Sequence, residues 1–243
     1  MDANLDALGE ALPLILEGMF ITLQLTVGGA ALALVIAVTL GLLARQHNVL
    51  LRGTARVIIE FFRGTSLVVQ LFWLFFVLPQ LGVELPAMLV GIVALGLNYG
   101  AYAAEVVRGS INSVAAGQWE AATALSLSPA QRMRRVVFPQ AWALMIPSLT
   151  NLLIHLLKGT AIVGFITIAD LTFRLDQLRI ETNTFFAYGV GLVMYFGIAY
   201  LLTLGMNALE VHAKHRLGRG ESLREALSLR SPDTGVASGQ ARS

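Results

Sequence analysis

The chain contains no cysteine and carries little charge. Cysteine is absent from all 243 residues, which excludes disulfide bonds and thiolate metal ligands. Only 13% of the residues are charged, whereas soluble domains carry about 25%. The net charge is +2 and the basic residues are scattered along the sequence, which argues against a nucleic-acid partner.

The motifs of common active sites are missing as well. The sequence has no glycine-rich phosphate loop of the kind that binds ATP. It has no G-x-S-x-G turn that would present a nucleophilic serine, and its four histidines lack the spacing of a metal site. We therefore expect no catalytic residues, no metal site and no enzyme activity in this chain.

What the chain has is apolar sequence: 56% of the residues are hydrophobic and the mean hydropathy is +0.71. Five runs without charge are each about 20 residues or longer, the length of a helix that crosses a membrane. They predict an all-α membrane protein with five transmembrane helices, over residues 14–44, 57–80, 86–108, 138–158 and 183–210. A shorter run, 159–169, predicts a re-entrant or interfacial segment. Gly28, Gly29 and Gly41 predict close packing between helices.

The basic residues predict an orientation. Arginines are frequent between the first two predicted spans, between the third and the fourth, and in the C-terminal tail, while the other side has only Arg174 and Arg179. By the positive-inside rule the N-terminus lies outside and the C-terminus in the cytoplasm. Residues 1–217 then form one membrane domain, and residues 218–243 form a cytoplasmic tail that is largely disordered.

One stretch, EAATALSLSPAQRMRRVVFPQ, interrupts the apolar sequence with charge. It predicts a cytoplasmic helix-turn-helix over residues 117–138. The first helix is expected over 117–127, with Glu120 in its first turn, where the helix dipole favours a carboxylate. The sequence Ser-Pro-Ala-Gln from Ser128 predicts a capping box, and Pro139 predicts a break or kink. The spacing of its apolar and charged residues fits two interpretations equally well. One is a docking element for a soluble partner, and the other is a solvated loop.

The same stretch resembles the EAA loop of the membrane subunits of ATP-binding-cassette (ABC) importers. Glu120, Ala121 and Ala122 match its opening, and Phe138-Pro139 match its close; Ser126 stands where glycine is usual. Three further blocks, beginning at Arg63, Tyr102 and Leu156, are similar to motifs of permeases for polar amino acids. They depart from those motifs at Ser66, Ser110 and Ala115. The resemblance covers about residues 15 to 217.

The resemblance implies a type I ABC importer permease. Two cytoplasmic ATPase subunits would dock on residues 117–138, which we name the coupling element, and would bind ATP and Mg, so that this chain holds no cofactor. A second permease subunit, copy or paralogue, and an extracytoplasmic binding protein would complete the transporter in a bacterial plasma membrane. The ATPase-docking residues implied are Glu120, Ala121, Ala122, Leu125, Ser126, Leu127 and Arg132. The implied substrate is a polar amino acid or similar zwitterion, with an ectoine-like compatible solute as an alternative.

Polar residues at membrane depth are candidates for the substrate pathway, because they are costly in lipid and should face the protein interior or a cavity. These are Arg63, Thr65, Gln70, Asn98, Tyr102, Glu105, Lys158 and Thr160. Structural alternatives remain open. Glu105 and Arg108 are three residues apart and would form an ion pair on one helix face. Lys158 would contact a substrate carboxylate, pair with an acidic side chain or extend to the membrane interface.

Two other classes of function compete with the importer permease. A self-contained secondary transporter or channel would need more intramembrane acids for ion coupling, and here these are nearly confined to Glu105. An intramembrane enzyme would need paired acids or a serine–histidine pair at matched depth, and the sequence provides no such pair.

Overall fold

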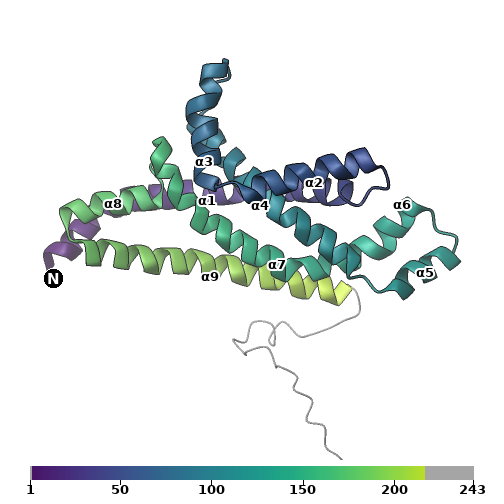
Figure 1. Cartoon of the computed structure of the whole chain (residues 1–243). Helices are drawn as coiled ribbons and strands as arrows, with labels where there is room; N and C mark the ends of the chain where they lie inside the picture. Colours follow the sequence, from purple (N-terminus) through teal and green to yellow (C-terminus); the bar gives the residue numbers. More distant parts are fainter. Residues whose placement is uncertain (1, 217–243) are drawn as a thin grey trace, which may run out of the picture.

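The computed structural model describes residues 2–216, and every regular element within this range is helical (Figure 1). The predicted tail, 218–243, lies outside the described residues. The α-helices are α1 (Asp2–Leu43), α2 (Val49–Gly64), α3 (Leu67–Phe72), α4 (Ala87–Asn112), α5 (Ala116–Ala124), α6 (Pro129–Gln131), α7 (Phe138–Gly159), α8 (Leu171–Glu181) and α9 (Thr184–Arg216). Two π-helices, η1 (Trp73–Val77) and η3 (Arg132–Val137), and two 3-10 helices, η2 (Leu78–Leu81) and η4 (Thr160–Ile166), adjoin them.

The long helices α1, α4, α7 and α9 form the body of the molecule. Figure 1 shows them running along one another, with α8 beside the N-terminus at one end and α5 and α6 at the other. Four helical segments are long and apolar enough to cross a membrane, and a bent pair can make a fifth. The prediction of an all-α membrane protein is therefore confirmed for the described residues.

The seam between α1 and α4 depends on glycine. A Cβ atom added to Gly96 would lie 2.6 Å from Cδ2 of Leu32, and one added to Gly41 would lie 2.9 Å from the carbonyl oxygen of Ala104. Neither distance leaves room for a side chain, so the two helix backbones approach closely here. The interpretation of Gly41 as a packing residue is confirmed.

The span predicted over 57–80 is not one continuous helix. The segment divides into Val49–Gly64 and Leu67–Leu81, which meet at an angle of 101°. Figure 1 shows α3 standing away from the layer of long helices. The break falls at Thr65 and Ser66, whose backbone is extended. Side chains from outside α2 bind its last carbonyl groups and so end the helix there.

The end of the bundle that holds the N-terminus contains a helix that the sequence analysis did not foresee. The 3-10 helix η4 continues α7, and the chain then turns at Thr167, which has a left-handed φ of 70°. Asp170 starts α8 as its N-cap, with Oδ1 accepting a 3.0 Å hydrogen bond from the Phe173 N–H. The apolar side chains of Leu171, Leu175 and Leu178 are buried against α1 and α9.

The coupling element corrects three details of the sequence analysis and confirms one. The first helix ends at Ala124 rather than at residue 127, and Glu120 is its fifth residue and so lies beyond the first turn. The capping box at Ser128 is present. Pro139 does not break the helix, because η3 widens the turn before it: the Phe138 N–H donates to the carbonyl of Met133, five residues back.

Candidate functional site

The coupling element is fastened to the body by a few specific contacts. Trp119 packs against the core formed by α1, α4 and α7, and Ala122 is 2% exposed. Arg132 donates a 2.8 Å hydrogen bond to Thr123 Oγ1, which joins η3 to α5. Another bond of 2.9 Å runs from Nε2 of Gln140 to Oε1 of Gln118. The two short helices are thus held to each other and to the start of α7.

Its outer face is left open. The side chain of Leu125 is 74% exposed at the tip of α5. Glu120, Ala121 and Ser126 are exposed beside it, whereas Ala122 is buried and Leu127 and Arg132 are partly buried. The predicted docking residues therefore divide into an outward-facing set and an anchoring set.

Ser126 makes the turn that the EAA loop usually gives to glycine. Its φ of 55° lies in the left-handed region, and its N–H donates to the carbonyl of Thr123. Left-handed backbone costs an L-residue about 1–2 kcal/mol. The turn is thus formed here with serine in a conformation that favours glycine.

Predicted pathway residues gather at the last turn of α2, where the helix leaves carbonyl groups without helical partners. The hydroxyl of Thr65 donates to the Phe61 carbonyl at 2.8 Å. The side-chain amides of Gln70 and Asn98 both donate to the Phe62 carbonyl, at 2.9 and 3.1 Å. The Tyr102 hydroxyl donates to the Arg63 carbonyl at 3.0 Å. Four predicted pathway residues, from α3, α4 and the break itself, therefore cap α2.

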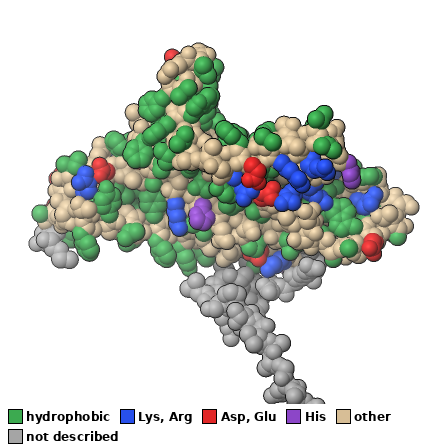
Figure 2. All heavy atoms as spheres, in the orientation of Figure 1, with side chains coloured by type: hydrophobic (Ala, Val, Ile, Leu, Met, Phe, Trp, Pro, Cys, Tyr) green, Lys and Arg blue, Asp and Glu red, His purple; other side chains and the backbone are tan. Residues whose placement is uncertain are grey.

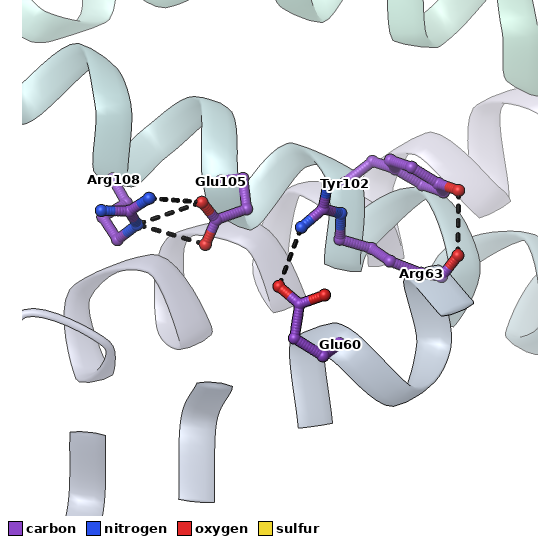
Figure 3. A network of polar contacts seen from close by, with 5 residues as sticks. All are labelled: Glu60, Arg63, Tyr102, Glu105 and Arg108. Carbon is purple, nitrogen blue, oxygen red and sulfur yellow. Dashed lines mark hydrogen bonds and ion pairs between the residues drawn. The ribbon is translucent and has the colours of Figure 1, made fainter. Parts of the chain in front are cut away.

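Charged side chains form a network beside this cap (Figure 3). The Arg63 guanidinium lies 3.0 Å from the Glu60 carboxylate and 5.4 Å from the centre of the Tyr102 ring. Arg108 binds Glu105 with both Nε and Nη2, the shortest contact being 2.6 Å. The predicted ion pair on one face of α4 is confirmed.

The other two pathway candidates lie apart from this network. Lys158 is exposed near the end of α7, and no contact between it and the network is found within residues 2–216. Thr160 is fully buried and its hydroxyl donates to the Leu157 carbonyl at 2.7 Å. The structure thus brings together Arg63, Thr65, Gln70, Asn98, Tyr102 and Glu105, but not these two.

The network offers both signs of charge and hydrogen-bonding groups on a partly exposed surface. Glu105 and Arg108 side chains are 27% and 34% exposed, and Arg63 is 33% exposed. Such a surface suits a solute with an ammonium and a carboxylate group, because each could exchange with a resident ion pair. In the described part of the chain no three His, Asp or Glu side chains gather as metal ligands would.

Comparisons with known proteins agree on one family. The family model described as "Binding-protein-dependent transport system inner membrane component" matches residues 37–215. The chain is 44% identical over 201 residues to the "Probable amino-acid ABC transporter permease protein y4tF" of Sinorhizobium fredii, covering 80% of this chain and 84% of that protein. It is 33% identical to the L-cystine transport system permease TcyB of Bacillus subtilis, covering 82% and 86% of the two chains.

Solved structures give the same result for the fold. A crystal structure of an amino acid ABC transporter with histidines matches with a TM-score of 0.76 and 33% identity, over 84% of this chain and 95% of that chain. The methionine ABC transporter MetNI in an inward-facing conformation matches with a TM-score of 0.69 at 21% identity, over 83% and 97%. The type I importer fold is therefore shared.

Proposed function

This chain belongs to the family of binding-protein-dependent transport system inner membrane components, and we propose that it is the membrane-spanning permease of an ABC importer for a polar amino acid or similar zwitterion. Separate cytoplasmic ATPase subunits bind ATP and Mg and drive it, a second permease subunit completes the pathway, and an extracytoplasmic binding protein delivers the solute. The chain itself performs no catalysis. Its N-terminus lies outside and its C-terminus in the cytoplasm of a bacterial plasma membrane.

One observation carries the proposal: an anchored helix-turn-helix presents an uncovered apolar tip. Leu125 exposes 74% of its side chain, yet Trp119 and Ala122 hold the same helix against the body. An exposed apolar side chain at the end of a fixed helix can serve as an anchor that enters a hydrophobic groove of a partner. Rigid attachment then lets motion of the ATPase reach α7 as a rigid-body movement.

The orientation is supported by charge. Arg45 and Arg132 lie at the end of the molecule that carries the coupling element. The opposite end carries α8, where Arg174 and Arg179 are paired with Glu17 and Asp176. Arg134 and Arg135 belong to the coupling element as well, so arginine is more frequent at this end, which favours the cytoplasm for it.

The docking role is tested by two matched substitutions in the assembled transporter. Leu125→Asp should abolish co-purification of the ATPase, because it places a charge in the apolar contact. Ile180→Asp, at a side chain 75% exposed on α8, is the control and should leave co-purification unchanged. Retention of the ATPase by the Leu125 variant at the level of the control would refute this docking role.

The solute pathway is proposed along the α2–α4 network of Arg63, Tyr102 and Glu105. The relatives named for amino acids support a polar amino acid, and an ectoine-like solute remains a second candidate. Uptake into proteoliposomes by the complete complex should require ATP. Uphill uptake by this chain alone, driven by a sodium or proton gradient, would instead establish a secondary transporter.

A further inference from the structure

A basic pocket lies where α1, the loop after it and the coupling element meet. It has a volume of about 520 Å³. Arg45, His47 and Arg132 line it together with the apolar or aromatic side chains of Leu42, Trp119 and Met133, and no Asp or Glu is among its lining residues. Arg63, Arg108, Arg174 and Arg179, by contrast, each have a carboxylate partner.

The two arginines lack a countercharge of their own. Neither Arg45 nor Arg132 forms an ion pair within residues 2–216. Arg132 uses one nitrogen for Thr123, but its Nε is buried without a hydrogen-bond acceptor. Burial, together with the nearby charge of Arg108, lowers the pKa of Arg45 from its usual value. An anion in the pocket would offset the repulsion between Arg45 and Arg108 and would accept a hydrogen bond from the Arg132 Nε–H.

Arg45 is also oriented before any ligand binds. Its guanidinium carbon lies 5.5 Å from the centre of the Trp119 ring, a cation–π contact that restricts the side chain. A guanidinium fixed in this way presents parallel N–H donors, the geometry that binds two oxygens of a phosphate.

The surroundings identify the source of the phosphate. Arg45 follows the last residues of α1, the longest apolar helix, so the pocket lies near the polar boundary of the bilayer. The first turn of α2 next to it exposes Val49, Leu50 and Leu51 by 68%, 79% and 48%. These side chains would contact acyl chains, while the pocket would receive the headgroup. Figure 2 shows Lys and Arg gathered over this end of the molecule, around α2.

We propose that this pocket binds the phosphate of an anionic phospholipid headgroup. Basic pockets beside membrane helices are known to recognise such headgroups. Because Arg45 belongs to the body and Arg132 to the coupling element, the bound lipid clamps the two together. The effect of this clamp on transport rests on the proposed function, because it assumes that the coupling element transmits motion from an ATPase. Binding of the lipid does not depend on that function.

The binding test uses the purified full chain in mixed micelles and native mass spectrometry. Phosphatidylglycerol is the probe, and phosphatidylcholine and inorganic phosphate are the comparison ligands. Phosphatidylglycerol should bind at least 10-fold more tightly than phosphatidylcholine, and Arg45→Gln with Arg132→Gln should remove most of the difference. Competition by inorganic phosphate at equal concentration would overturn the lipid assignment in favour of a free anion, and equal binding of the two lipids would overturn it altogether.

The control pair is Arg52→Gln with Arg56→Gln, which removes the same charge from α2 outside the pocket lining. This pair should weaken phosphatidylglycerol binding less than 3-fold. An effect as large as that of the pocket pair would overturn a specific site and indicate general surface attraction. If the double pocket variant does not fold, Arg45→Gln alone, which keeps the bond between Arg132 and Thr123, should still weaken binding at least 3-fold.

A second measurement separates this proposal from the proposed function. In the assembled complex, replacing phosphatidylglycerol by phosphatidylcholine should lower transport per ATP hydrolysed while the ATPase stays bound. No lipid binding with normal transport would overturn the site and leave the importer role intact. Lipid binding by a chain with which no ATPase associates would support the lipid site and overturn the importer role.

Discussion

The two ends of the bundle carry short helices that are fastened in opposite ways. At one end α8 buries Leu171, Leu175, Leu178 and the carboxylate of Asp170 in the body of the protein. At the other end α5 buries only Ala122 and depends on hydrogen bonds near the surface, while it exposes Leu125. The difference shows that α8 is part of the core, whereas the coupling element is an attached unit that leaves Leu125 exposed.

The largest effect should come from shortening a buried leucine of α8. Leu175→Ala should lower the free energy of unfolding by about 2–5 kcal/mol, because it leaves a cavity in the core. Leu125→Ala, directly after α5, should change it by no more than about 0.5 kcal/mol, as exposed substitutions do. Thermal unfolding of the purified chain measures both. Similar losses of unfolding free energy for the two variants would show that α8 is no more deeply packed than the coupling element.

The second prediction concerns pH and the α8 end. Burial raises the pKa of the Asp170 carboxyl to about 6, from 3.8. Between about pH 4 and pH 6 the Asp170 carboxyl therefore keeps its proton in the folded chain and has lost it in the unfolded chain. The free energy of unfolding is thus highest below about pH 4 and falls as the pH rises through about 6. The difference corresponds to at most about 3 kcal/mol.

Asp170→Asn should remove this loss, since asparagine keeps the N-cap and carries no charge. Thermal melting at a series of pH values from 4.5 to 7.5 should show the variant gaining most at the highest pH. Asp176→Asn is the control on the same helix. Hydrogen bonds from Arg179 and Tyr188 lower the pKa of Asp176, so any stabilisation from that residue is lost as the pH falls. A flat difference between wild type and Asp170→Asn would contradict the buried-carboxylate account.

The smallest effect should be local to the coupling element. Ser126→Gly should stabilise the turn by about 1 kcal/mol, because glycine adopts positive φ without strain. Ala130→Gly, which places glycine in the neighbouring short helix, should destabilise it by about 0.5–1 kcal/mol. Hydrogen exchange of residues 123–131 in the full chain measures these changes. Faster exchange in the Ser126 variant would refute the strained turn.

The sequence was sufficient to predict those features that depend on residues close together in the chain. The capping box at Ser128 and the ion pair of Glu105 with Arg108 each involve residues three apart, and both are present in the structure. The long apolar helices follow from length and hydropathy in the same way. These features need no knowledge of which helices are neighbours.

The sequence was insufficient to predict those features that depend on contacts with another helix. The break after α2 depends on Asn98, which is 36 residues from the carbonyl that it binds. Gln118 and Gln140 are 22 residues apart, so their hydrogen bond could not be foreseen from local spacing. Asp170 is fully buried as the N-cap of α8, a helix that the sequence analysis did not foresee. Such contacts appear only once the packing of the bundle is known.

The shared acceptor at Phe62 has a mechanical consequence. Two amides, one from α3 and one from α4, hold the same oxygen, so the corner between α2 and α3 is braced from both sides. A braced corner cannot flex by itself, because opening it would strand a carbonyl group and two amide groups away from water. Any movement at this corner must therefore turn α2, α3 and α4 together, as one piece.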